Sequence, residues 1–119
     1  HARHPRPGGD AGSPFEALSR PASALLCGDF NCRPGSPEYA AISARFDDDA
    51  TPALLDAWTW AHPGEAHPLT AGLYDQSWPQ ACCFDFVFVS ADLAPRVARV
   101  EVESSTQASD HQPVLLELA

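Results

Sequence analysis

The sequence contains no methionine and no lysine. Its seven basic residues, all arginine, face 16 aspartates and glutamates, so the net charge is −9. The absence of lysine excludes phosphate-binding loops and Schiff-base chemistry that depend on a lysine amine. The shortage of basic side chains argues against sequence-independent binding of nucleic acid, because that binding needs a surplus of Lys and Arg. No apolar run is long enough to cross a bilayer.

Cysteine is also sparse, with four residues in a chain of 119. No Cys-x-x-Cys pair is present, so the spacing does not favour a zinc site, even with His62 or His67 added. Small secreted domains that rely on disulfides usually carry more cysteine. We therefore expect small buried thiols in a reducing compartment, with a cytoplasmic location. The four cysteines are Cys27, Cys32, Cys82 and Cys83.

The length of 119 residues predicts a single domain with its own hydrophobic core. Because the chain starts at His1 and has no methionine, we expect it to be part of a longer or processed protein. Residues 1–19 are rich in Gly, Pro, Arg and His, which is typical of a loop or arm. A second irregular stretch, from His62 to Gln80, is long enough to suggest a functional loop, although a Pro-rich surface connection is the alternative.

Between these stretches the pattern predicts both strands and helices. Ser36 followed by Pro37 has the features of a helix start, and Thr51–Pro52 repeats them. The mixture indicates an α/β or α+β layered domain. The expected elements are strands at Ala22–Cys27, Cys83–Ser90, Val97–Val102 and Pro113–Leu118, with helices from Ser36 to about Phe46 and from Thr51 through Trp58.

Asp85 interrupts an otherwise apolar strand, CFDFVFVS. Side chains alternate between the two faces of a strand, so Asp85 shares a face with Val87 and Val89. A buried carboxylate is costly without hydrogen-bond donors or a charged partner. It is either a structural aspartate bonded to backbone N–H groups or an aspartate that orients a catalytic histidine.

Two further polar groups follow or precede apolar strands. Asp29 and Asn31 come directly after the first strand and are expected to point the same way in extended geometry. They could form a ligand contact or an Asx-type turn. Asp110 and His111 stand just before the last strand, and His111 could be the partner that Asp85 needs.

Three motifs in this order resemble the endonuclease/exonuclease/phosphatase family of metal-dependent phosphoesterases. They are GDFN at Gly28–Asn31, DFVFVS at Asp85–Ser90 and SDHQPV at Ser109–Val114. The resemblance implies the C-terminal half of a four-layered α/β sandwich with mostly antiparallel strands. It assigns residues 22–119 to that half and leaves residues 1–21 as an arm.

The resemblance also implies a role for each matching residue. His111 resembles the residue that contacts the scissile phosphate and is often assigned as base, and Asp85 its orienting partner. Asp29 resembles the acid/base carboxylate near the attacking water or leaving oxygen, and Asn31 the amide that holds a phosphate oxygen. Asp110 resembles a ligand of Mg²⁺ or Mn²⁺, cations that prefer oxygen ligands.

The implied function, for the full-length parent protein, is hydrolysis of a phosphate ester by a metal-activated water, with a small molecule, a lipid headgroup or a nucleic acid as substrate. The family also uses an Asn, a Glu and a His upstream of GDFN. Only 27 residues precede Gly28, they contain no Asn, and Glu16 lies in the Pro-flanked arm, so it is not assigned that role. We therefore expect part of a site. The alternatives are an inactive truncated enzyme acting as an interaction module, or, more remotely, a zinc domain.

Overall fold

The computed structural model describes residues 23–45 and 53–119. The expected arm and the Thr51–Pro52 pair lie outside these residues. The described elements are β1 (Leu25–Asp29), α1 (Pro37–Ile42), β2 (Leu54–Asp56), α2 (Ala57–Ala61), β3 (Asp85–Ser90), a 3₁₀ turn (Ala94–Arg96), β4 (Val97–Val102) and β5 (Val114–Leu118).

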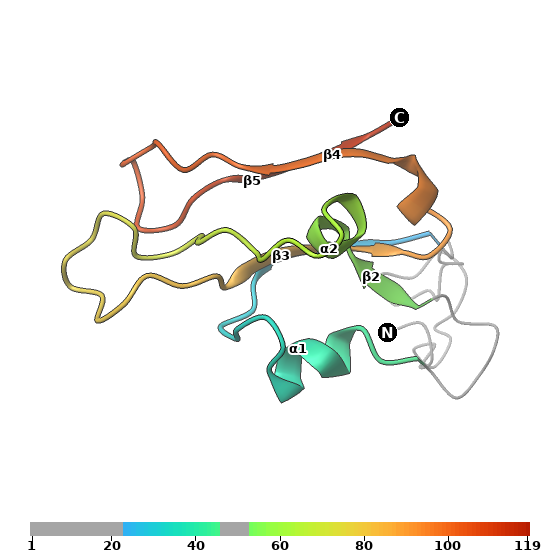
Figure 1. Cartoon of the computed structure of the whole chain (residues 1–119), viewed down its shortest axis with the longest axis horizontal. Coiled ribbons are helices and arrows are strands. Elements are labelled where there is room, and N and C mark those ends of the chain that lie inside the picture. The colour runs from blue at the N-terminus through green and yellow to red at the C-terminus, as the bar shows by residue number, and fades with distance from the viewer. Residues whose placement is uncertain (1–22, 46–52) are drawn as a thin grey trace, which may run out of the picture.

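The strands form two antiparallel sheets, which confirms the predicted mixed α/β class. β3 lies between β1 and β2 in one sheet, and β4 pairs with β5 in the other. The β4–β5 pair forms one layer, the β3-centred sheet forms the next, and α1 lies on the far side of that sheet (Figure 1). Within the described residues no helix is long and apolar enough to span a membrane.

β3 lies at the centre of the fold because apolar side chains project from both of its faces, as its sequence predicts. Phe86 and Phe88 pack in a cluster with Cys32 and Cys83, and Tyr39 of α1 packs against that cluster. The opposite face contributes to a second cluster, which α2, β4 and β5 complete; its buried members are Ala57, Val89, Ala94 and Val100. The period-2 alternation of one strand therefore supplies the core on both sides of the sheet.

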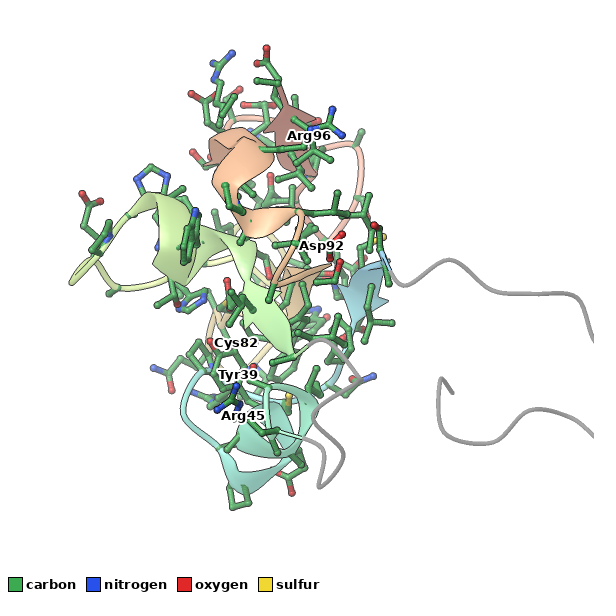
Figure 2. The ribbon with its side chains drawn as sticks, turned by 90° about the vertical axis from the view of Figure 1, so that its right-hand side faces the viewer. Tyr39, Arg45, Cys82, Asp92 and Arg96 are labelled. Atoms are coloured by element: carbon green, nitrogen blue, oxygen red, sulfur yellow. The ribbon has the colours of Figure 1, made fainter. Side chains whose placement is uncertain are left out.

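The predicted start of the first helix is confirmed. The Ser36 hydroxyl accepts a hydrogen bond from the Tyr39 N–H, and Pro37 stands at the first helical position. The helix ends at Ile42, earlier than the expected end near Phe46. Figure 2 shows Tyr39 and Arg45 at the α1 end of the molecule and Arg96 at the opposite end.

The second predicted helix is wrong at Leu54 and Leu55. Leu54 and Leu55 belong to β2, where they pair with β3. The helix begins only at Ala57, because the Asp56 carboxylate caps it by accepting from the N–H groups of Trp58 and Thr59. Two adjacent leucines fit a helix or a strand locally, and pairing with β3 decides between them.

β1 also differs from expectation. Gly28 does not end the strand but lies inside it, opposite Phe86 with a φ of +145°, so the strand reaches Asp29. Cys32, Cys82 and Cys83 are buried, as predicted, whereas Cys27 is exposed. The exposed Cys27 lines an open groove together with Gly28 and Asp85.

Candidate active site

The register between β1 and β3 places two carboxylates side by side. Asp29 lies directly opposite Asp85 in the antiparallel pair. Directly opposed residues project their side chains on the same face of a sheet, and two like charges in this arrangement destabilise it. This pair of carboxylates therefore needs a hydrogen-bond donor or a positive charge beside it.

His111 fills that position from the segment before β5. Its Nδ1 lies 2.9 Å from Oδ2 of Asp85, and its Nε2 lies 3.9 Å from Oδ2 of Asp29. The first distance is a hydrogen bond and the second is too long to be one. An ionised carboxylate only accepts, so the Nδ1–H of His111 donates to Asp85. The structure thus brings together three of the predicted site residues.

The surroundings of His111 favour its protonated form. The hydrogen bond to Asp85 raises the pKa of His111 above its ordinary 6.5. Burial lowers this pKa, whereas the negative charges of Asp85, Asp29 and Asp110 raise it further. The ring stays 27% exposed, so a substrate can reach it. A partly exposed imidazole can both accept and return a proton.

Thr70 is a member of this cluster that sequence reasoning missed. Its hydroxyl donates to Oδ2 of Asp85 at 2.7 Å and accepts from the N–H groups of Phe84 and Asp85 at 3.0 and 3.1 Å. Thr70 is fully buried in the irregular segment before β3. No local sequence pattern marks Thr70 as a site residue. The indication in the sequence was Asp85, because a carboxylate in an apolar strand requires hydrogen-bond donors.

The GDFN segment forms a turn rather than continuing extended. Oδ1 of Asp29 accepts from the N–H of Asn31 at 2.8 Å, and Asn31 has a φ of +51°. The expectation that the two side chains point the same way in extended geometry is therefore wrong. The Asx-type turn uses one oxygen of Asp29 and leaves the other facing His111. Contact of the Asn31 amide with a phosphate oxygen stays a prediction.

Asp110 is exposed beside His111 and makes no hydrogen bond to the other site residues. Its Oδ1 accepts from the Ser109 hydroxyl at 3.3 Å, and its backbone carbonyl accepts from the N–H of Gly72. Across residues 23–45 and 53–119, no three His, Cys, Asp or Glu side chains are grouped to hold a metal ion. The described residues alone therefore do not form a complete divalent cation site, and Asp110 as a ligand stays a prediction.

The long irregular stretch supplies an aromatic side chain beside the site. Trp78 lies edge-on to the ring of His111, with 5.7 Å between ring centroids and 78° between ring planes. Two other ring-bearing residues of the same stretch, His67 and Tyr74, do not reach the site. His67 bonds to Asp56, and the Tyr74 hydroxyl donates to the Ser104 carbonyl.

Gly72→Ala is expected to displace Trp78 from His111. A Cβ at Gly72 would lie 2.8 Å from the Trp78 ring, and its φ of +72° already disfavours a side chain. We expect a loss of about 2–4 kcal/mol in unfolding free energy from strain and overpacking together. The matched control is Gly64→Ala, with a φ of +82° and open space around its Cβ. Equal urea midpoints for the two variants would contradict the close packing of Trp78 on Gly72.

Comparison with known proteins agrees with the motifs. Searches of curated proteins and of solved structures found no significant match. The model of the endonuclease/exonuclease/phosphatase family matches residues 3–111 of the 119, a range that includes Asp29, Asp85 and His111. The chain therefore belongs to the endonuclease/exonuclease/phosphatase family, whose members are generally phosphoesterase-type hydrolases.

Proposed function

We propose that this chain hydrolyses a phosphate ester by attack of water on phosphorus, with His111 as the central residue. The observation that supports this most directly is the His111 ring, bonded through Nδ1 to Asp85 and facing Asp29 with Nε2. Such hydrolysis needs a group that takes a proton from water and positive charge near the phosphoryl oxygens. An imidazole between two carboxylates can do both, because those carboxylates stabilise it once protonated.

Each neighbouring side chain has a proposed role. Asp85 holds the proton on Nδ1, so the Nε2 lone pair of neutral His111 is free to accept a proton. Asp29 acts as an acid/base group at the attacking water or the leaving oxygen. The amide of Asn31, on the turn that Asp29 caps, donates to a phosphoryl oxygen. The ester P–O bond breaks, and the leaving oxygen takes up a proton.

A divalent cation, Mg²⁺ or Mn²⁺, is the proposed cofactor. Members of the family are typically dependent on a divalent metal. Asp110 is the proposed ligand among the described residues, and any further protein ligands would come from residues outside them. Bound there, the cation would neutralise charge on the substrate phosphate. Such a cation would also offset the charges of Asp29, Asp85 and Asp110, which repel an anionic substrate.

The substrate is proposed only as a phosphate ester. With a net charge of −9, the chain is less suited to long duplex nucleic acid than to a small or lipid-derived ester. The assignment of residues 22–119 to the C-terminal half of the family's domain stays a prediction.

The proposal is tested by incubating the purified chain with bis(4-nitrophenyl) phosphate and with 4-nitrophenyl phosphate. We expect release of nitrophenolate with Mg²⁺ present and loss of that release with EDTA, restored by excess Mg²⁺. Turnover that is unaffected by the chelator would contradict the metal dependence. Absence of turnover with every ester and metal tried would contradict hydrolysis itself.

The alternative function is that of an inactive interaction module. It is favoured by apolar side chains exposed on strands: Leu25 is 51% exposed on β1 and Leu115 is 53% exposed on β5. Exposed apolar surface is a common feature of interaction sites. Light scattering that finds a monomer, together with Mg²⁺-dependent release of nitrophenolate, would rule out this alternative.

A further inference from the structure

Thr70 lies where three segments of the active site meet. Its N–H donates to the carbonyl of Cys82 at 2.8 Å, and its own carbonyl accepts from the N–H of Gln112 at 2.7 Å. Cys82 lies just before the segment that carries Asp85, and Gln112 follows His111 directly. The Thr70 backbone is therefore bonded to both segments whose side chains make the Asp85–His111 pair.

The hydroxyl of Thr70 has little freedom to reorient. It accepts from two backbone N–H groups, those of Phe84 and Asp85, which occupy its acceptor side. Its single proton is then left for Oδ2 of Asp85, 2.7 Å away. Thr70 is 1% exposed, so solvent does not compete for these bonds. The Asp85 carboxylate is consequently held in one rotation.

The same oxygen of Asp85 takes two donors, the Thr70 hydroxyl and the His111 Nδ1–H. A carboxylate held by one fixed donor presents its remaining lone pair in a defined direction. That direction decides which ring nitrogen of His111 carries the proton, since a carboxylate can only accept.

We propose that Thr70 is the positioning residue of the site, which holds Asp85 so that neutral His111 exists as the Nδ1–H tautomer with Nε2 free. This inference rests on the proposed function for its catalytic consequence. Its structural part, the tautomer, is independent of any activity. Thr70 acts through Asp85 and does not itself reach a substrate.

The test compares Thr70→Val, which removes the hydroxyl at nearly constant shape, with Thr70→Ser, which keeps it. For Thr70→Val we expect kcat to fall about 10- to 100-fold with KM little changed, as when the group that orients a ligating or catalytic histidine is lost. Thr70→Ser should recover most of the rate. A Thr70→Val enzyme with the wild-type kcat, or a Thr70→Ser enzyme as slow as Thr70→Val, would overturn the assignment.

A measurement that does not depend on turnover tests this inference separately from the proposed function. Long-range ¹H–¹⁵N NMR spectra distinguish a protonated from an unprotonated ring nitrogen in a neutral imidazole. The wild-type chain should show His111 mainly as the Nδ1–H tautomer, and Thr70→Val should show a mixture. A wild-type chain with mainly the Nε2–H tautomer would overturn the inference even if the valine variant failed to fold. The expected tautomer in a chain without turnover would contradict the proposed function alone.

Discussion

Replacing His111 with alanine is expected to lower phosphate-ester hydrolysis by about 10²- to 10⁴-fold, the range for loss of a positioned acid–base group. The substitution removes the proton acceptor, and it also removes the imidazole that lies beside the opposed carboxylates of Asp29 and Asp85. The rate loss should appear in kcat, because proton transfer belongs to the transition state. Initial rates of nitrophenolate release measure it.

A second variant separates chemistry from packing. His111→Gln keeps an amide donor for Asp85 but cannot take up a proton near neutral pH. It should therefore be almost as slow as the alanine variant while retaining more of the fold. The matched control is His62→Ala, because His62 contacts the Val100 carbonyl and stacks on Trp58, away from the site. Near wild-type turnover by His111→Gln would disprove the role of His111 as the base.

Replacing Asp56 with alanine is expected to cost about 3 kcal/mol of unfolding free energy. Oδ2 of Asp56 accepts from the Tyr39 hydroxyl at 2.8 Å and lies 2.7 Å from Nε2 of His67, while Oδ1 caps α2. Asp56 is 7% exposed, and its removal leaves the partly buried donors Tyr39 and His67 without this partner. The lost helix cap adds to that penalty. Urea unfolding followed by circular dichroism measures the loss.

The control for Asp56 is Asp75→Ala. Asp75 also accepts a backbone N–H at 2.8 Å, from Ser77, but it lies in an exposed turn, so its removal should change the midpoint far less. Equal midpoints for the two variants would show that the Asp56 cluster does not stabilise the fold. Tyr39→Phe should give an intermediate loss, since it removes one of the bonds to Asp56.

The Asp56 contribution should also depend on pH. Burial alone would raise the pKa of Asp56, but hydrogen bonds from His67 and Tyr39 outweigh it and hold that pKa below its ordinary 3.8. A carboxyl whose pKa is lower in the folded state stabilises the fold above its unfolded pKa, and this stabilisation is lost as the pH falls through the folded pKa. The difference in stability between wild type and Asp56→Ala should therefore shrink in acid below about pH 4. A constant difference across that range would contradict the ionised state of Asp56.

Among residues 23–45 and 53–119, two Asp–His pairs are hydrogen-bonded, and the sequence pointed to one of them. Asp85 and His111 stood out because the aspartate breaks an apolar strand and the histidine precedes another. Asp56 and His67 looked like members of a helix and a loop. They pair because β2 joins β3 and brings Asp56 over the face where Tyr39 packs. Strand pairing across more than 30 residues has no local signal.

The sequence by itself determined the family, through three motifs in order, and the two apolar faces of β3, through its period-2 alternation. It also determined the Ser36 cap, because capping is a local interaction. Tertiary structure alone decided that Asp29 lies opposite Asp85 and that Thr70 bonds to it. The physical reason is that periodicity shows which face a side chain occupies, whereas its partner depends on strand register and on the path of a loop.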